Sequence, residues 1–332
     1  MATGRLRRAA WFGVSTLILL AMLLFADVDE VLSVFRAAEL NYFVLALFFG
    51  LSTFLVFAFT WYRCFGMVGE DLSYIRSLRI YLAGEFLNSV TPVGQLGGEP
   101  FMAYIIRENS DMRYEEALST VLSADIINAV PMITFVLAGF TYLIASGPVD
   151  GFIGRAAGAV LLAAAIGSFL VYSLWFRADK LESFIVSAFE RFTAAMGRGE
   201  HHLGTVEDRM ASMRKTLESI GADRYGLIFT ALAAHLFFIL GLGSLHFVML
   251  ALGVEVGLAS LVFVVAFSGA SNFVPTPGGA GAFEFAMALF LVMFAGVGVP
   301  VATAAAILYR AASYWPVMII GYLSLLSLEG RN

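Results

Sequence analysis

The chain contains few charged residues for its length. Asp, Glu, Lys and Arg make up only 14% of its 332 residues, whereas a soluble domain usually has about a quarter. Its single cysteine, Cys64, excludes an internal disulfide and a cysteine metal cluster. The formal net charge is small, −5, and no basic stripe with interleaved aromatic residues appears, so we expect no nucleic-acid partner.

Hydrophobic residues, in contrast, make up 60% of the chain and occur in long runs. A helix needs about 20 apolar residues to cross a bilayer. Six runs suggest full spans, at 11–26, 41–62, 116–145, 156–176, 225–252 and 301–327. The chain is therefore predicted to be an all-α, polytopic integral membrane protein with about six full spans. Pro316 predicts a kink near the middle of the last span.

The first apolar run could belong to a retained span or to a signal peptide, because Arg5, Arg7 and Arg8 precede it. No small-residue cleavage site of the Ala-x-Ala type follows this run, and acidic residues come next. We therefore expect a retained first span.

Two short segments interrupt apolar runs with the same pattern of residues. Each begins with Thr-Pro, continues through glycines and ends with a glutamate seven residues after the proline, at 91–99 and at 276–284. An asparagine stands just before each segment, Asn88 and Asn272. Helix breakers and a carboxylate at membrane depth are costly. The pattern therefore predicts two broken helices that face one polar cavity.

The apolar arms around these breaks form two helical hairpins, at 77–106 and at 258–295. The arms themselves lie at 77–91, 93–106, 258–274 and 278–295. After the first break, helix is expected to begin at Glu99 and Pro100, because proline suits the first helical position. The first hairpin is predicted to be re-entrant, while the arms of the second are nearly long enough to span, so both possibilities stay open for it.

The distribution of Lys and Arg predicts the orientation of the chain. With the N-terminus in the cytoplasm, seventeen of the twenty basic residues fall on the cytoplasmic side; Arg36 and Arg155 fall outside and Arg310 lies within the last span. We expect a multi-pass protein of the cell membrane with both termini in the cytoplasm. The two hairpins then enter from opposite sides, as in an inverted repeat.

One long polar stretch, 177–224, divides the chain. Apolar residues recur in it at helical spacing on either side of 197–204, so we expect two amphipathic helices on the cytoplasmic face. They would join an N-terminal membrane half, 1–176, to a C-terminal membrane half, 225–332. A connecting hairpin is favoured over a regulatory module.

The helix breaks and a buried arginine supply the candidates for substrate binding. Unpaired N–H groups at helix N-termini attract anions, and glycine lets a phosphate approach the backbone closely. A buried arginine should find a carboxylate or a phosphate. The candidates are Asn88, Gly97, Gly98, Asn272, Gly278, Gly279, Gly281 and Arg310. Two alternatives stay open: the glycines serve close helix packing, and Arg310 forms a static pair with Glu284.

Four polar residues are candidates for gating or ion coupling. Glu99 and Glu284 end the two repeated segments, and Asp125 and Asn128 share one face of a predicted span, three residues apart. The alternative for each glutamate is a structural cap that accepts backbone N–H bonds. We expect no metal site, because the two histidines at helical spacing, His235 and His246, have no third ligand.

Three parts of the chain carry a resemblance to a known family. They are 84–92 with 97–100 and 103–104, then 275–284, and finally 308–310 with 314–316. Together they resemble the lysylphosphatidylglycerol synthase transmembrane-region family over nearly the whole chain. Met102 departs from the pattern, since many relatives have an arginine there.

This resemblance implies a function in the membrane. In the synthases, aminoacyl transfer resides in a separate soluble domain, and the membrane domain resembles a lipid flippase. Other relatives are attached to glycosyltransferases or stand alone. The chain ends soon after its last span, so we expect a stand-alone member without the synthase activity.

The motifs and the resemblance together predict a lipid flippase that moves a phospholipid or a polyprenyl-phosphate-linked saccharide through a central polar cavity. No nucleotide-binding loop is present, so we expect no cofactor and no direct use of ATP. One alternative is a non-transporting scaffold for a membrane glycosyltransferase. Another is an intramembrane hydrolase of a lipid phosphate or a peptide bond, with Ser271 as nucleophile and His235 or His246 as base. A homodimer stays open.

Overall fold

The computed structural model describes residues 13, 16–90, 95–146, 203–269, 271, 274 and 276–329. Within these residues the chain forms helices and turns, with no β-strand, as the sequence predicts. Five helical segments of the described chain are long and apolar enough to cross a membrane: Leu40–Met67, Tyr114–Tyr142, Arg224–Ala251, Pro277–Ala295 and Val299–Leu328. The prediction of an all-α, polytopic membrane protein is confirmed.

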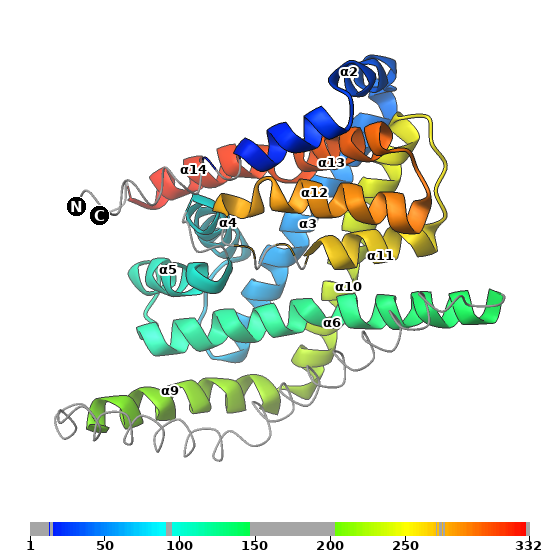
Figure 1. Cartoon of the computed structure of the whole chain (residues 1–332). Helices are drawn as coiled ribbons and strands as arrows, with labels where there is room; N and C mark the ends of the chain where they lie inside the picture. Colours follow the sequence, from blue (N-terminus) through cyan, green and yellow to red (C-terminus); the bar gives the residue numbers. More distant parts are fainter. Residues whose placement is uncertain are drawn as a thin grey trace, which may run out of the picture.

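The described helices follow one another along the chain as Figure 1 shows. They are Thr16–Phe25, α2 (Val28–Ala37), α3 (Leu40–Met67), α4 (Tyr74–Val90), α5 (Gln95–Glu108), α6 (Tyr114–Ser146), α9 (Leu203–Ala222), α10 (Arg224–Ala251), α11 (Leu258–Ser268), the 3₁₀ turn η2 (Pro277–Gly279), α12 (Ala282–Phe290), the π-helical turn η3 (Leu291–Ala295), α13 (Val299–Ser313) and α14 (Trp315–Glu329).

Three predicted spans appear as single long helices: α3, α6 and α10 match 41–62, 116–145 and 225–252. The first predicted span is described as the shorter apolar helix Thr16–Phe25. The predicted span at 156–176 lies outside the described residues.

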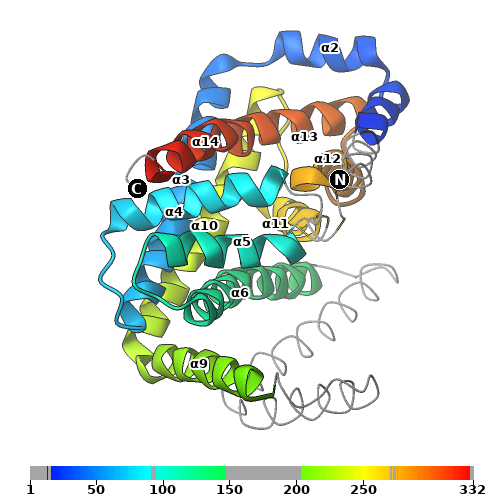
Figure 2. The same ribbon diagram turned by 90° about the vertical axis from the view of Figure 1, so that its left-hand side faces the viewer.

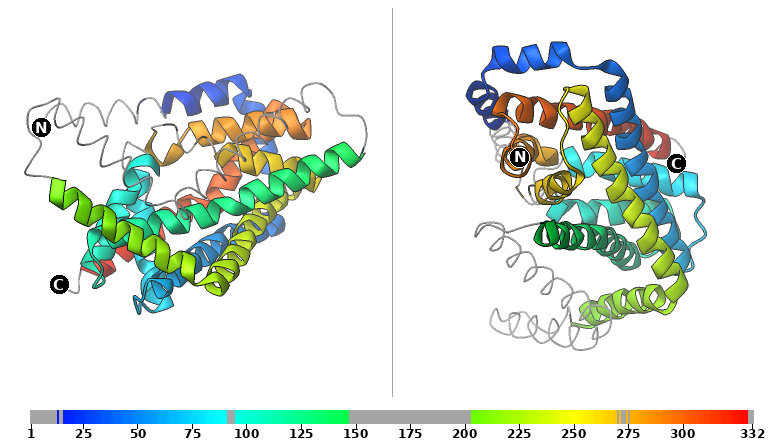
Figure 3. Two further views of the ribbon diagram at one scale, coloured as in Figure 1. Left: turned by 90° about the horizontal axis from the view of Figure 1, so that it is seen from below. Right: turned by 90° about the vertical axis from the view of Figure 1, so that its right-hand side faces the viewer.

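The most extensive helix–helix contact joins α3 and α10, which run side by side (Figure 3). Ser244 of α10 ties them together by donating a hydrogen bond to the Ala46 carbonyl at 2.9 Å. The other side of α3 exposes large apolar side chains, including Val44 and Phe48, the latter 64% exposed. An apolar helix that leaves such residues uncovered is suited to a lipid environment.

The second predicted hairpin is present as α11, the turn η2 and α12, and the first is described by its two helices, α4 and α5, while 91–94 lie outside the described residues. In Figure 1, α4 and α5 lie at the left, and α12 runs above α11 toward the right. The expected start of helix at Glu99 and Pro100 was wrong, because α5 begins at Gln95, and α11 ends at Ser268, within the apolar arm 258–274. Pro100 lies inside α5, where it has no N–H to donate to the carbonyl four residues earlier. Gly269 follows α11, and a glycine weakens further helix. Re-entrant topology and the inverted repeat stay predictions.

The last predicted span is divided into α13 and α14 at Tyr314, two residues before Pro316. Pro316 has no N–H to donate to the carbonyl of Ala312. Gly50 of α3 packs against this carbonyl so closely that a Cβ atom on it would lie 2.6 Å from the Ala312 oxygen. The expected kink is therefore present, and α3 packs closely beside it.

This contact gives a first prediction. Gly50→Ala should destabilise the protein by about 1–3 kcal/mol, because backbone cannot yield to the added methyl group. Gly66→Ala on the same helix is the matched control, since a Cβ atom there meets nothing within 4 Å. Thermal unfolding in detergent compares the two variants, and equal stability of both would contradict the packing described.

The helix α9 comes from the second half of the predicted linker and lies along α6 (Figure 2). Arg113, just before α6, donates a hydrogen bond to Ser212 of α9 at 3.0 Å. Ile220 is fully buried. One of the two predicted amphipathic helices is thus observed, while the first lies outside the described residues, and the cytoplasmic location stays a prediction.

Candidate functional site

The second break depends on glycine for its backbone conformation. Gly278, Gly279 and Gly281 have φ angles of +58°, +67° and +82°. Residues other than glycine have a strained backbone in this left-handed region. A Cβ atom on Gly278 would also lie 1.8 Å from the Tyr314 hydroxyl oxygen. The glycines of this segment are therefore required by the turn itself, whatever else they bind.

A buried ion pair holds the second break to α13. Arg310 Nε donates to Glu284 Oε1 at 2.9 Å, and Arg310 Nη2 donates to the Gly278 carbonyl at 2.8 Å. The second oxygen of Glu284, Oε2, accepts from Gly281 N at 2.7 Å, at the start of α12. Arg310 and Glu284 are only 5% and 3% exposed. The static pair and the helix cap, both left open by the sequence, are observed together.

The guanidinium group of Arg310 keeps further hydrogen-bonding capacity. It stacks on the ring of Tyr314, with 3.5 Å from Cζ to the ring centroid, and lies 5.1 Å from the centroid of Phe283. Arginine has five N–H donors, and two of them have an acceptor among the described residues. Since Arg310 lines a cavity, the remaining donors are available to an anion there.

The two hairpins meet around this cavity, which has a volume of about 230 Å³. The break element η2 lies directly against α4. The wall is formed by residues from α3, α4, α10, α11, η2, α12 and α13, together with Tyr314, which follows α13. They are Thr53, Phe54, Phe57, Tyr81, Glu85, Asn88, Ser89, Phe237, Phe238, Gly241, Val265, Gly278, Gly279, Phe283, Tyr309, Arg310, Ser313 and Tyr314.

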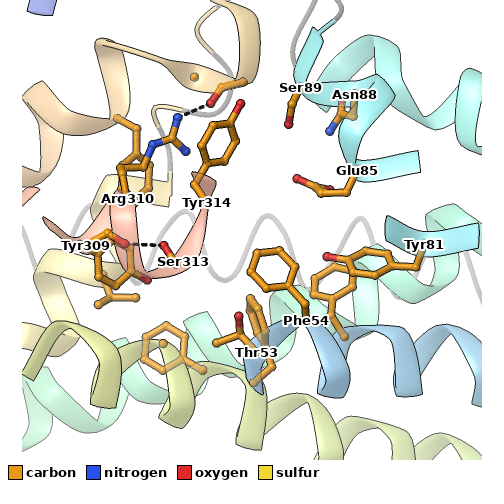
Figure 4. Close-up of a pocket in the computed structure, with 18 residues that line it drawn as sticks. Thr53, Phe54, Tyr81, Glu85, Asn88, Ser89, Tyr309, Arg310, Ser313 and Tyr314 are labelled. Carbon is orange, nitrogen blue, oxygen red and sulfur yellow. Dashed lines mark hydrogen bonds between the residues drawn. The ribbon is translucent and has the colours of Figure 1, made fainter. Parts of the chain in front are cut away.

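Charged groups face the cavity from opposite walls (Figure 4). Arg310 and Tyr314 lie on one side, while Glu85, Asn88 and Ser89 of α4 lie on the other. Aromatic rings complete the lining. An apolar wall with a few converging polar groups is typical of a ligand site. A cavity with polar groups therefore lies between α4 of the first hairpin and the second break, in the described part of the chain.

Three carboxyl groups from three successive helices lie near one another beside this cavity. Glu85 of α4, Glu99 of α5 and Asp125 of α6 are each within electrostatic range of the other two. Glu85 and Asp125 are surrounded by protein, yet part of each side chain remains accessible, as expected for residues that face an internal space. Glu99 is half-buried.

The predicted site residues divide between the cavity, the ion pair and its surroundings. Asn88, Gly278, Gly279 and Arg310 line the cavity. Gly281 and Glu284 lie behind it and support Arg310. Gly97 and Gly98 belong to the first turn of α5, where backbone N–H groups have no intrahelical acceptor. Asn272 lies outside the described residues.

Asn128 contacts α3: its Nδ2 donates to Thr60 Oγ1 at 2.9 Å. Asn128 is absent from the cavity wall, as are Glu99 and Asp125. The proposed roles of these residues in gating or coupling stay predictions. Glu99 and Asp125 are, however, within electrostatic range of Glu85.

Among the residues of the cavity wall that were not predicted from the sequence, three are polar groups close to the predicted ones. Glu85, Ser89 and Tyr314 were not among the candidates, although the first two share a face of α4 with Asn88. Glu85 is a carboxylate within an apolar arm, which is itself a signal for a functional residue. Tyr314 gave no such signal, because its position depends on the break between α13 and α14.

Two of the groups named for a hydrolase, Ser271 and His235, are engaged elsewhere. The Ser271 hydroxyl donates to the Ser268 carbonyl. His235 contacts Thr134 Oγ1 at 2.9 Å through Nε2 and the Ala231 carbonyl at 2.7 Å through Nδ1. The geometry of the described residues therefore gives no support to a Ser271–His235 nucleophile.

Comparison with known proteins agrees with the motifs. Residues 11–321 match the family described as Lysylphosphatidylglycerol synthase TM region. The chain belongs to this family. A UPF0104 membrane protein of Methanothermobacter thermautotrophicus is 22% identical over 307 residues, which cover 91% of this chain and 90% of the relative.

Two further relatives match over shorter stretches. UPF0104 membrane protein PH1989 of Pyrococcus horikoshii is 23% identical over 126 residues, or 38% of each chain. UPF0104 membrane protein MJ1595 of Methanocaldococcus jannaschii is 23% identical over 134 residues, or 40% of each chain. The alignment therefore spans well under half the length of these two relatives. All three names describe a membrane protein, in agreement with the apolar helices.

Proposed function

We propose that this protein is a lipid flippase of the cell membrane, which moves a phospholipid or a polyprenyl-phosphate-linked saccharide between leaflets and is not itself an enzyme. The observation that supports this proposal is the cavity between the two broken hairpins, lined by both Arg310 and Glu85. In a lipid environment, buried charged groups and irregular backbone are tolerated where they line a cavity.

The cavity suits a headgroup better than a whole lipid. Its volume of about 230 Å³ is small, so the acyl chains would stay in the bilayer while the headgroup passes. The donors of Arg310 that have no protein acceptor would receive the phosphate, and Asn88 and Ser89 offer further hydrogen bonds from the opposite wall. Glu284 would keep Arg310 in place during this passage.

Filling the cavity tests this proposal without touching its charged groups. Gly241 of α10 lines the wall, and a Cβ atom on it would make ordinary contacts, 3.6 Å from the Tyr309 hydroxyl. Gly241→Ala should therefore keep transport, while Gly241→Leu should abolish it by occupying the space of the headgroup.

The measurement is the movement of a fluorescent phospholipid between leaflets of liposomes that contain the purified variants. Size-exclusion profiles and thermal unfolding show whether both variants are folded. Undiminished transport by a folded Gly241→Leu protein would contradict a headgroup pathway through this cavity.

A further inference from the structure

The carboxyl groups beside the cavity lack the partners that buried charges usually have. Glu85 and Asp125 have no salt bridge and no hydrogen bond to other described residues. Both oxygens of Glu284, by contrast, are occupied by Arg310 and Gly281. A buried charge without a partner is strongly disfavoured. The two unpartnered groups are therefore the ones that remain available to bind something.

Cationic side chains near the cluster do not neutralise it. Arg310 is within electrostatic range of Glu85, but its charge is already balanced by Glu284 at 2.9 Å. Arg63 of α3 is within electrostatic range of Cys64, as is Asp125. The guanidinium group of Arg63 stacks over Phe229, 5.6 Å from the ring centroid. With all three carboxyl groups ionised, the described residues around Glu85, Glu99 and Asp125 would therefore carry an excess of negative charge.

In the described part of the chain, the groups named below on the other helices add no charge that would offset this excess. The thiol of Cys64 comes from α3, and the phenol of Tyr81 from α4. His235 of α10 is bonded to Thr134, Tyr322 of α14 packs against Phe86, and α11 has no titratable residue. On α9, the cation of Arg214 is paired with Glu218 and both are exposed.

Two buried polar atoms, one on α6 and one on α3, also lack a partner among the described residues. They are Asn128 Oδ1, one helical turn from Asp125, and Trp61 Nε1, on a ring that packs 5.3 Å from Tyr81. Asn128 and Trp61 are only 8% and 1% exposed. Buried polar atoms are usually satisfied by ordered water when protein offers nothing. Their presence indicates a hydrated pocket that reaches Asp125.

We propose that Glu85 and Asp125 form a proton-binding pair that couples transport to the proton gradient. This inference rests on the proposed flippase function. Like charges that share a low-dielectric site cannot all remain ionised, so a proton held by the pair removes their repulsion while the cavity is closed. When the cavity opens, the carboxylic O–H bond breaks and the proton passes to water. Glu284, tied to Arg310, takes no part in this exchange.

The pair is tested first without any transport measurement. In infrared spectra of the purified wild-type protein at neutral pH, the C=O stretching band of a protonated carboxylic acid should be present and should shift in D₂O. Glu85→Gln and Asp125→Asn should each lose this band. Glu108→Gln is the matched control, because Glu108 is exposed and paired with Arg107 at 3.0 Å. Its spectrum should keep the band.

The absence of the band from the wild type, or its persistence in both Glu85→Gln and Asp125→Asn, would overturn the proposal. If one of these variants fails to fold, the other decides the result. Lipid movement by a wild-type protein without the band would refute proton binding and leave the proposed function intact. A band lost in the variants of a wild type that moves no lipid would refute the function and support proton binding.

Coupling is tested second, in liposomes with an imposed pH gradient. Wild-type lipid movement should respond to the direction of the gradient, and Glu85→Gln should lose this response. Replacing Na⁺ by choline should change nothing. Loss of the response in choline would overturn the assignment of the proton as the coupling ion.

Discussion

Arg310→Ala should lower the stability of the protein by about 3–5 kcal/mol, because it leaves the charge of Glu284 buried and unpaired. The guanidinium group joins three parts of the site: it bonds Glu284 of α12 and the Gly278 carbonyl of η2, and it stacks on Tyr314 after α13. All three contacts disappear together. Thermal unfolding in detergent measures the loss, and lipid movement should be abolished in the same variant.

A double variant distinguishes the effect of the unpaired Glu284 charge on stability from the effect of losing the contacts of Arg310. Arg310→Met with Glu284→Leu removes both charges and should recover much of the lost stability, since a buried pair can often be replaced by apolar residues of similar volume. The double variant should still transport no lipid, because the cavity has lost its only cationic donor among the described residues that line it. A single Arg310→Ala variant as stable as the wild type would show that the pair does not hold the second break.

Gly278→Ala should lower stability by at least about 2 kcal/mol, through two separate effects. The φ angle of +58° strains any residue with a side chain, and the new Cβ atom would overlap the Tyr314 hydroxyl. Because Tyr314 also stacks on Arg310, its displacement should disturb the ion pair and reduce lipid movement as well.

Two comparisons distinguish the effects at Gly278. Gly253→Ala has a similar φ angle, +72°, but its Cβ atom would meet nothing within 4 Å, so it should show the backbone strain alone. Adding Tyr314→Phe to Gly278→Ala removes the overlapping hydroxyl and should restore part of the stability. Equal losses in Gly278→Ala and Gly253→Ala would mean that the contact with Tyr314 contributes nothing.

Much of the fold could be predicted because hydrophobic length and helix breakers act locally. The spans at α3, α6 and α10 and the two breaks follow from runs of apolar residues and from Pro-Gly segments. Element ends were less predictable. The start of α5 at Gln95 and the end of α11 at Ser268 depend on how the surrounding residues accommodate nearby glycine and proline. A single sequence does not specify this.

The site was predicted in part for the same reason. Arg310 and Glu284 could be paired from the cost of a buried charge alone, and the observed distance of 2.9 Å agrees. The position of Glu85 opposite Arg310 could not be derived, because it depends on how α4 packs against η2. The same applies to Tyr314, which reaches the site only through the break that Pro316 produces in the last span.

A cryo-electron-microscopy structure of the wild-type protein in lipid nanodiscs tests the central claim most directly. We expect the two helix breaks to meet at the depth of the membrane, and headgroup density or ordered water to occupy the space between Glu85, Asn88 and Arg310. Breaks that lie far apart, or that face acyl chains with no polar space between them, would contradict it.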